Sequence, residues 1–478
     1  MVSKLEKIFR GMIYILPGVL FFSYQPLIHF GTSESMNFEI SLPLIWLVLF
    51  DVLVIWLMGQ KKMLFRGFSK KWMWLLLPIW FSLSVLWSLN ALRGILVVGI
   101  VWLLYLAIDG IISLRELFKK ESSKVKFWKA FFWSSLLICA WCWIQCVLDL
   151  VGVPREYSLM CAGCTYSMFG FPHPDGFAIE PQFMGNLLLA PTIVAGWLML
   201  RSRPRPADPS PRAAGANSRA AALRNAASLK HYTILFFVFT ATLFLTFSRG
   251  AIYALLVATL VMMIWQIVQT KKWRWLSIGL VIVLSFLFTL NIQGIMAQVS
   301  RTDDTYFTGI SKVINHLSLG VIDLEVNDSG NVGATDGSTE AVFDGYVAES
   351  TDTRLELSES AFRVWRQDFS TVMFGVGLGG AGQALYVNGL SSAPKEIVQN
   401  QYVSILLETG VVGVALCVLT LVLVVRAFWQ SPLRVVLIGL LIAYGVSLLF
   451  FSGLPNALHI YLLPVVIYAI GLRKKLVS

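Results

Sequence analysis

Residues 402–425 read YVSILLETGVVGVALCVLTLVLVV, and Glu408 is the one charged residue among these 24. A helix needs about 20 apolar residues to cross a bilayer, so this run predicts a transmembrane helix. Comparable runs recur from the first dozen residues to the last. Of the 478 residues, 57% are hydrophobic and 14% charged, against about a quarter charged in soluble proteins. We therefore expect an all-α polytopic membrane protein and exclude soluble enzymes, disulfide scaffolds and disordered chains.

The apolar runs predict about twelve transmembrane helices. They lie near residues 9–29, 40–58, 72–88, 94–114, 130–150, 179–200, 231–247, 251–269, 275–293, 402–425, 435–451 and 455–472. One long outer segment separates the ninth span from the tenth. The chain thus divides into 1–293 with nine spans, the outer segment 294–401, and 402–478 with three spans.

The basic residues predict the orientation of these spans. With both termini in the cytosol, 29 of the 38 Lys and Arg residues fall on the cytosolic side, whereas 21 of the 27 acidic residues lie outside. Every alternate loop then obeys the positive-inside rule, which a missed or invented span would have inverted. The net charge of +11 is therefore explained by topology and by contact with membrane lipids, and it indicates no nucleic-acid partner.

Three shorter features bear on processing and on structure outside the membrane. The first apolar run follows a basic N-terminus but lacks a small-x-small cleavage site, so we interpret it as a retained span. Cys161 and Cys164 form a C-A-G-C motif in an outer loop, where a local disulfide and two free thiols are both open. A zinc site there would need two further ligands. Residues 201–230, rich in Arg, Pro, Ala and Ser, predict a flexible cytosolic linker.

The outer segment 294–401 is long enough to build structure outside the bilayer. Apolar residues at helical spacing predict a helix lying on the membrane surface, and they are Tyr306, Ile310, Val313, Ile314 and Leu317. The acidic stretch 324–352 follows, rich in Gly, Ser, Thr and Asn. Its acids lack the order of an EF-hand loop, which favours a mobile segment over a calcium site.

A second outer helix is expected over residues 354–372. Its apolar residues recur at every fourth position, at Leu357, Ala361, Trp365 and Phe369. Arg363 and Arg366, three residues apart, share another part of the helix surface and present two guanidinium groups on the outer side. Glu359 precedes Arg363 by four residues, so an ordinary surface ion pair is an open alternative.

Residues 374–382, FGVGLGGAG, contain five glycines. Gly375, Gly377 and Gly380 match the pattern G-x-G-x-x-G, but no βαβ unit surrounds them, so a dinucleotide site is excluded. The glycines instead predict a tight turn with close backbone approach, whose amides can face an anion.

Further polar residues lie at the outer ends of the predicted spans. Only Ser248, Arg249 and Gly250 separate the seventh span from the eighth, so Arg249 is held at the outer boundary, where a guanidinium needs an anionic partner or snorkels to headgroups. Other polar residues precede the sixth span or begin the tenth, namely His173, Glu180, Gln182, Gln399, Asn400, Tyr402 and Glu408. For several of them a simpler role as helix cap or turn residue is an open alternative, namely Glu180, Gln399, Asn400 and His173.

The order and spacing of these motifs resemble the O-antigen ligase and Wzy-type polysaccharide polymerase superfamily. The similarity covers about residues 165–425 and is carried by Gly176-Phe-Ala-Ile-Glu180-Pro-Gln182, Ser248-Arg249-Gly250-Ala251, Arg363-x-Trp365 with the glycine-rich turn, and Gln399-Asn400-Gln-Tyr402 through Gly410. The resemblance implies a GT-C-like glycosyltransferase of the bacterial inner membrane that uses no metal or cofactor. Such an enzyme would move a glycan from an undecaprenyl diphosphate carrier to an acceptor at the outer face of the membrane.

One departure from the superfamily bears on the reaction. Ligases usually carry His-Asn where this chain has Gln399-Asn400, and that histidine is their proposed general base. Glutamine cannot accept the proton. The departure favours a polymerase, whose acceptor is another lipid-linked repeat unit and which can act with a chain-length regulator. A ligase with a lipid or protein acceptor is the alternative.

The candidate residues match the demands of such a transfer. Guanidinium groups bind phosphate oxygens bidentately and stay charged, so the expected diphosphate ligands are Arg249, Arg363 and Arg366. An attacking hydroxyl must lose its proton, and the expected acceptor is Glu180, with His173 second and Glu408 third. The residues expected to position the acceptor and the glycan are Gln182, Gln399, Asn400 and Tyr402.

A transporter or flippase for lipid-linked glycans is a third interpretation. Such folds usually show internal repeats and charged residues near the membrane midplane. Here Asp51 and Asp109 are the only carboxylates in the middle of spans, and no repeat relates the two halves. The segment 294–401 is an asymmetric insertion, so the sequence favours an enzyme over a transporter.

Overall fold

The structure is a computed structural model. It describes residues 2–30, 38–62, 68–118, 120–158, 172–178, 180–201, 216–271, 273–299, 305–319, 321–322, 353–394, 396–454 and 456–471. Helices dominate these residues, and the strands among them are β1 (Pro26–Phe30) and β2 (Phe38–Ser41), which form one antiparallel pair. The expected all-α membrane class is confirmed, and the short hairpin was not foreseen.

Eleven of the twelve predicted spans coincide with helices of the described residues. These helices are α2 (Leu42–Gln60), α3 (Phe68–Ser84), α4 (Ala91–Ser113), α5 (Glu121–Leu150), α8 (Pro181–Arg201), α9 (Ala216–Leu245), α10 (Arg249–Thr270), α11 (Leu276–Val299), α16 (Gln401–Trp429), α17 (Arg434–Ser447) and α18 (Leu458–Gly471). Seven helices of the described part of the chain are long and apolar enough, by length and composition, to cross a membrane. The chain is therefore a multi-pass membrane protein, while a total of twelve spans stays a prediction.

Two boundaries differ from the sequence-based expectation. The helix α1 (Val2–Leu20) ends nine residues before the predicted end of the first span, because a turn and the strand β1 follow it. The helix α9 begins at Ala216, inside the predicted linker 201–230, where six alanines between 216 and 228 favour helix. Residues 202–215 of that linker lie outside the described residues.

The chain forms two compact units, and we describe each by itself. Unit 1 comprises Met1–Phe131, Gly345–Ile438 and Tyr444–Ser478, and unit 2 comprises Phe132–Asp344 and Gly439–Ala443.

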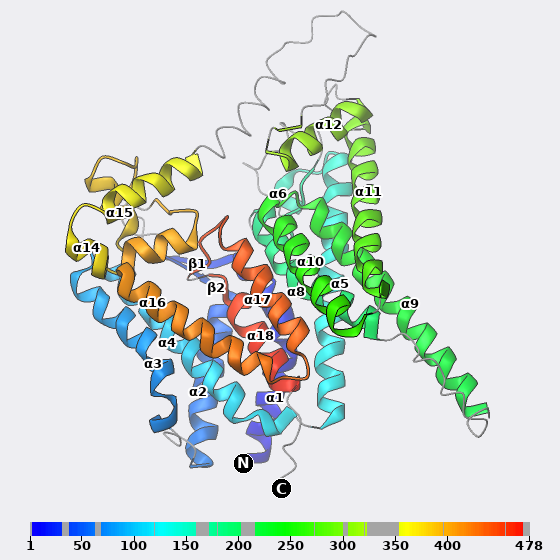
Figure 1. Cartoon of the computed structure of the whole chain (residues 1–478), viewed down its shortest axis with the longest axis horizontal. Coiled ribbons are helices and arrows are strands. Elements are labelled where there is room, and N and C mark those ends of the chain that lie inside the picture. Colours follow the sequence, from blue (N-terminus) through cyan, green and yellow to red (C-terminus); the bar gives the residue numbers. More distant parts are fainter. Residues whose placement is uncertain are drawn as a thin grey trace, which may run out of the picture. The chain divides into compact units, whose positions relative to one another are not determined.

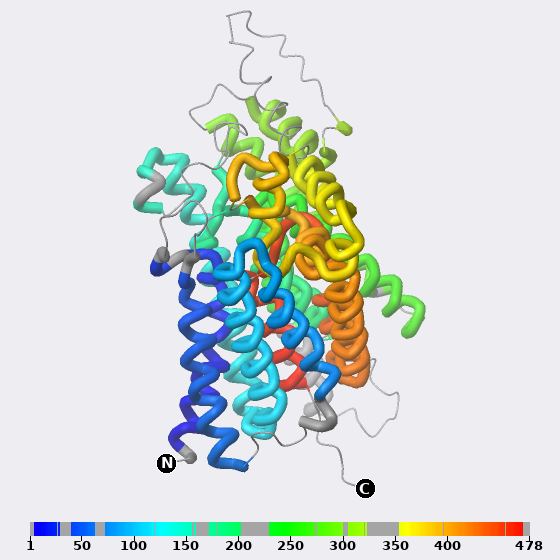
Figure 2. The backbone as a smooth tube through the Cα atoms, turned by 90° about the vertical axis from the view of Figure 1, so that its left-hand side faces the viewer, coloured from blue at the N-terminus to red at the C-terminus, as the bar shows by residue number. Residues whose placement is uncertain are grey.

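In unit 1, α2 packs between α1 and α4, as the neighbouring tubes in Figure 2 show. Stacked aromatic rings join these helices to the short helix η2 (Arg115–Phe118), because Phe9 lies 5.2 Å from Phe50 and 5.5 Å from Phe118 between ring centroids. The helix α3 packs against α16. The C-terminal end of α3 and the N-terminal ends of α4 and α16 contact the segment 353–387, which is described next.

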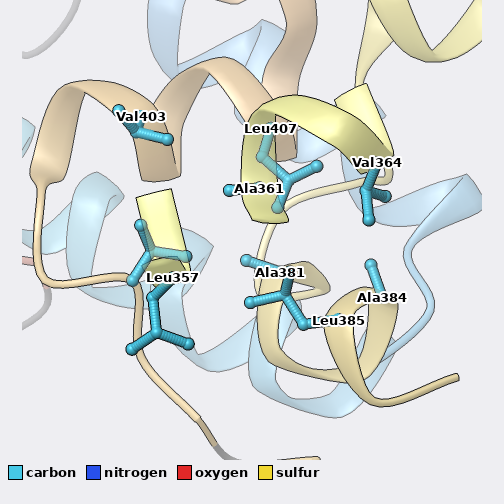
Figure 3. Packing of buried hydrophobic residues seen from close by; sticks show 9 residues of the cluster. Leu357, Ala361, Val364, Ala381, Ala384, Leu385, Val403 and Leu407 are labelled. Carbon is cyan, nitrogen blue, oxygen red and sulfur yellow. The ribbon is translucent and has the colours of Figure 1, made fainter. Parts of the chain in front are cut away.

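Unit 1 also contains a helix over residues 353–365, α14 (Phe369–Phe374) and α15 (Ala381–Val387). Leu357, Ala361 and Val364 are buried against α15 and the first turns of α16 (Figure 3). The single helix expected over 354–372 is wrong, because the chain breaks at 366–368. Asp368 caps a new helix by accepting from the Thr371 amide at 2.8 Å. Phe369 consequently leaves the apolar stripe and is 78% exposed.

In unit 2, α8 is almost wholly buried and packs against α9 and α10. Glycines permit this packing, since a Cβ at Gly196 would lie 3.0 Å from the Phe236 ring of α9. The helix α12 (Tyr306–Leu317), expected from its apolar residues, lies at the end of α11 (Figure 1). The acidic stretch 324–352 and the pair Cys161 and Cys164 lie outside the described residues.

Candidate active site

The turn between α9 and α10 presents Arg249. Ser248 is the N-cap of α10, and its hydroxyl accepts from the Ala251 amide at 3.3 Å, which satisfies one of the free amides at the helix start. The preceding residue, Phe247, has φ of +54°, a left-handed conformation that disfavours a large side chain. The turn therefore holds local strain, and the cap fixes Arg249 as the first residue of the helix.

Arg249 is partly buried and acts electrostatically on Tyr253, one turn later on α10. The N-terminal end of a helix carries partial positive charge and amides that point outward. The guanidinium group and the helix end therefore favour the same kind of ligand, an anion such as a phosphate.

The start of α8 is joined directly to this turn. The Ser248 hydroxyl donates to the Gln182 carbonyl at 3.3 Å, and the Gln182 side-chain amide donates to the Glu180 carboxylate at 2.6 Å. A Cβ at Gly185 would lie 2.6 Å from the Cβ of Ser248, so only glycine permits this approach of α8 to the turn. The Glu180 carbonyl accepts from two amides of the first turn of α8, so the residue also caps that helix. Its carboxylate stays partly exposed beside Gln182.

His173 reaches the same turn through a ring contact. Its imidazole is 6% exposed and stacks on Phe247, with 4.6 Å between ring centroids. The turn that carries His173 is fixed by Gln145, whose side chain donates to the Asp175 carboxylate and accepts from the Gly176 amide, each at 2.9 Å. The structure thus gathers four of the sequence-predicted residues of unit 2 around one turn, namely His173, Glu180, Gln182 and Arg249.

The two arginines of unit 1 lie in a different setting. The Arg363 side chain is 72% exposed, and its Nη2 lies 3.9 Å from a carboxylate oxygen of Glu359, which is the alternative surface ion pair. The Arg366 guanidinium lies 6.0 Å from the Phe362 ring centroid and is also exposed. These arginines belong to unit 1 and Arg249 to unit 2, so their meeting at one diphosphate stays a prediction.

The glycine-rich turn, residues 374–382, forms hydrogen bonds with α16 at a break in that helix. At Gly410, φ is +64°, and three carbonyls before the break accept bonds from outside the helix. The Val376 and Gly377 amides donate to the carbonyls of Leu407 and Glu408 at 2.9 Å, and the Trp80 indole donates to the next carbonyl, that of Thr409, at 3.3 Å. The turn thus replaces the helical hydrogen bonds that the break removes.

The glycines of this turn are required by its close backbone contacts. Gly375, Gly377 and Gly379 all have positive φ, and a Cβ at Gly377 would lie 2.3 Å from the Ser88 Cα. The Ser88 hydroxyl donates to the Leu378 carbonyl at 2.8 Å. The predicted close approach is therefore present, but several of the amides face α16 of the protein itself.

Glu408, the third candidate base, lies within these contacts. Its carboxylate accepts from the Ala381 amide at 3.5 Å and interacts electrostatically with Arg93 of α4. Arg93 is the neighbour that sequence reasoning missed, since no motif links two residues so far apart in the chain. These contacts give Glu408 a structural role in holding the turn.

The residues at the start of α16 act first as caps and ties. The Asn400 side chain accepts from the Tyr402 and Val403 amides at 3.0 and 3.2 Å, and the Tyr402 hydroxyl donates to the Gly445 carbonyl at 2.7 Å. Gln401, which the motif analysis passed over, accepts from the Gly453 and Leu454 amides. The side-chain oxygen of Gln399, in contrast, has no hydrogen-bond partner within the part of the chain that the structure describes.

One further polar group near Arg249 was missed. Asn186, one turn after Gln182 on α8, is 2% exposed. Its side-chain amide donates to the Gln182 carbonyl at 3.0 Å, whereas its side-chain oxygen has no hydrogen-bond partner among the described residues. The sequence held a signal for this residue. A polar side chain within an apolar span costs free energy, and such residues therefore often mark functional sites. Among the described residues, no three His, Cys, Asp or Glu side chains form a candidate metal site.

Comparison with protein families identifies the part of the chain that holds these features. Residues 234–418 match the family model described as O-antigen ligase. Over this segment the chain is similar to O-antigen ligases. The matched segment runs from α9 to α16 and includes Arg249, Arg363 and the glycine-rich turn, whereas His173 and Glu180 precede it. A search of curated proteins finds no match.

Proposed function

We propose that the protein is a membrane glycosyltransferase that polymerises undecaprenyl-diphosphate-linked repeat units at the outer face of the bacterial cytoplasmic membrane. The observation that carries the proposal is the family match over 234–418 together with Arg249 at the start of α10, inside that match. In the proposed orientation both termini lie in the cytosol, and the fold is GT-C-like.

The proposed reaction moves one glycan chain. A hydroxyl of the acceptor glycan bonds to the anomeric carbon of the donor, the bond from that carbon to the diphosphate oxygen breaks, and the diphosphate leaves with the electron pair. Arg249, Arg363 and Arg366 are the proposed partners of the negative charge on the leaving group. Gln182, Gln399, Asn400 and Tyr402 are the proposed contacts to the sugars, and no metal or cofactor takes part.

Glu180 is the proposed acceptor of the hydroxyl proton. Its carboxylate is partly exposed and held by the Gln182 side chain at 2.6 Å, which keeps it oriented beside the Arg249 turn. His173 is the second candidate, and its stacking on Phe247 leaves little of the ring exposed. Glu408 is the third, although the contacts that hold it to the glycine-rich turn favour a structural role.

A ligase is the second candidate, because the family description itself names O-antigen ligases. A ligase would transfer the glycan to a lipid or protein acceptor. Gln399 stands where ligases usually carry histidine, and glutamine cannot take up the proton. This residue is the reason to prefer the polymerase.

The test is turnover by the purified full-length protein in proteoliposomes. Lipid-linked oligosaccharide is added without ATP and with EDTA present, and product length is read by gel electrophoresis and mass spectrometry. A ladder of longer glycans supports the polymerase, and transfer to an added lipid A or protein acceptor supports the ligase. Unchanged glycan that crosses the bilayer would instead indicate a transporter.

The Gln399→His variant separates the two enzymes. The polymerase needs no histidine at this position, so wild type is active and the variant gains nothing. If only the Gln399→His protein transfers glycan, the natural chain is a ligase that has lost its base.

A further inference from the structure

The C-terminal end of α16 carries a shallow groove. It has a volume of about 430 Å³ and is lined by Leu421, Val422, Val425, Arg426, Trp429 and Gln430. These residues form two rows whose members are four positions apart, so the rows run side by side along one face of the helix. The groove therefore follows the helix axis over about 14 Å, at a rise of 1.5 Å per residue.

The described part of the protein leaves this face of α16 largely uncovered. Only 11% of the most apolar stretch of α16 is buried within the protein, against 33 to 89% in the other six helices long and apolar enough to cross a membrane. Leu421, Val422 and Trp429 are each about half exposed. A membrane helix of this kind meets lipid with its exposed face, so lipid is the natural neighbour of the groove.

The groove joins an apolar part to a charged part. Its aliphatic residues come first, and Arg426, Trp429 and Gln430 follow at the end of the helix. Trp is enriched where membrane helices reach the lipid headgroups, so this end of the groove lies at that level. The Arg426 side chain is exposed, and none of the described acidic residues pairs with it. A guanidinium group at this level therefore lacks a counter-charge from the described protein.

We propose that this groove binds one anionic phospholipid, with the lipid phosphate at Arg426 and an acyl chain along Leu421, Val422 and Val425. A guanidinium group binds phosphate oxygens through charge-assisted hydrogen bonds. The Gln430 side-chain amide is a further donor at the same end of the groove.

Charge complementarity favours an anionic lipid over a zwitterionic one. Phosphatidylcholine also carries a phosphate, but its choline group cancels the negative charge, whereas phosphatidylglycerol keeps it. Arg426 also lies in the last turn of α16, where a cation suits the helix dipole. That ordinary role needs neither the groove nor a particular lipid, so the choice of lipid separates the two roles. The proposal does not depend on the proposed transferase reaction.

The test is photo-crosslinking of lipid to the purified full-length protein in nanodiscs of phosphatidylcholine. The probe is phosphatidylglycerol with a diazirine in one acyl chain, and phosphatidylcholine with the same chain is the matched lipid. Mass spectrometry locates the adducts. We expect residues 421–430 to take up about fivefold more phosphatidylglycerol than phosphatidylcholine, since one cation near anionic lipid contributes about 1 kcal/mol. Equal labelling by the two lipids overturns the proposal.

Variants assign the preference to the groove. Arg426→Gln removes the charge and should bring phosphatidylglycerol labelling of 421–430 down to the phosphatidylcholine level. Arg434→Gln is the matched control, because Arg434 is an exposed arginine of the same unit that does not line the groove. It should label as wild type does. Unchanged labelling in Arg426→Gln, or an equal loss in Arg434→Gln, overturns the proposal.

A second variant tests the apolar part. Val422→Phe keeps Arg426 and narrows the groove at an exposed position, where a larger side chain is accommodated. We expect labelling of 421–430 by phosphatidylglycerol to fall, because the acyl chain loses its place. Labelling equal to wild type would show that the groove holds no chain, and the proposal would be wrong.

Two other occupants give different results. If unlabelled undecaprenyl phosphate displaces the probe better than unlabelled phosphatidylglycerol does, the groove holds a polyprenyl lipid and the proposal is wrong. If native mass spectrometry shows a dimer in which 421–430 escapes labelling, a second copy of the chain covers the groove and the proposal is equally wrong. We expect labelled monomer and displacement by phosphatidylglycerol.

Discussion

Arg249 and Arg363 place the same guanidinium group in two different surroundings. Arg249 begins a capped helix, is partly buried, and lies beside a turn that contacts α8 and α12. Arg363 lies on an exposed helix surface, 3.9 Å from a carboxylate of Glu359. Contacts with neighbouring helices fix the position of Arg249, whereas the Arg363 side chain contacts only its own helix through the Glu359 pair and is mostly exposed. In the proposed function, Arg249 is therefore the better placed of the two to orient the diphosphate, because the surrounding fold fixes its position.

The largest effect is expected from Arg249→Ala. Loss of a charge-assisted phosphate contact should lower glycan transfer more than tenfold, which corresponds to more than about 1.4 kcal/mol of transition-state stabilisation. The assay is the proteoliposome turnover described above. Arg434→Ala is the control, since Arg434 also begins a membrane helix but on the predicted cytosolic side. Activity of Arg249→Ala above a tenth of wild type would remove Arg249 from the site.

Gly377→Ala should reduce stability in unit 1 without touching either arginine. The added Cβ would lie 2.3 Å from the Ser88 Cα, at φ of +88°, and we expect a loss of about 3 kcal/mol in the free energy of unfolding. Gly389→Ala is the matched control, because φ there is +68° but nothing lies within 4 Å of the added atom. It should cost only about 1 kcal/mol. Equal losses in thermal unfolding would show that backbone conformation, and not contact with Ser88, explains the glycine.

Arg363→Gln should lower glycan transfer severalfold and leave unfolding unchanged. An exposed ion pair contributes less than about 1 kcal/mol, so its loss has little effect on stability. Glu359→Gln breaks the same pair and should leave transfer unchanged or raise it. If both variants lose activity equally, the pair itself is needed and Arg363 is no direct ligand of the diphosphate.

The smallest effect concerns Asp368, just after the exposed arginines. Hydrogen bonds from Ser370, and then from the amide and hydroxyl of Thr371, lower the pKa of Asp368 to about 2. Because the folded pKa lies below the ordinary value of about 3.9, the cap stabilises α14 above pH 4 and is lost as pH falls toward 2. The protection factor of the Thr371 amide, which is its intrinsic exchange rate divided by the observed rate, should therefore fall in wild type as pH is lowered from 4 toward 2. In Asp368→Asn this fall should be absent, and its persistence would assign it to another group.

Much of the fold could be predicted because a bilayer imposes long apolar runs. The spans around α2, α4 and α10 follow from composition alone. The break at 366–368 could not be predicted from composition. The apolar residues favour one long helix, whereas Asp368 favours the start of a new helix, and the sequence alone does not show which preference prevails. The length of α9 was underestimated for a related reason, because an Ala-rich polar segment lacks the apolar face of a packed helix yet has high helix propensity.

The candidate site was predicted in part. The sequence selected His173, Glu180, Gln182 and Arg249, which the structure gathers around one turn, because each flanks a span on the predicted outer side. The neighbour of Glu408, Arg93, could not be found without coordinates. Two polar residues that are far apart in the chain and meet only in the folded protein show no characteristic sequence spacing, so their contact cannot be predicted from sequence.

The break at Gly410 divides α16 into two pieces of different kind. The piece after it, 411–429, has 19 residues and a length of about 28 Å, close to the hydrocarbon thickness of a bilayer. The nine residues before the break, 401–409, are bonded through their last carbonyls to the glycine-rich turn and to Trp80. They therefore belong structurally to the glycine-rich turn, and Glu408 is part of this bonded assembly and not of the long apolar piece that follows.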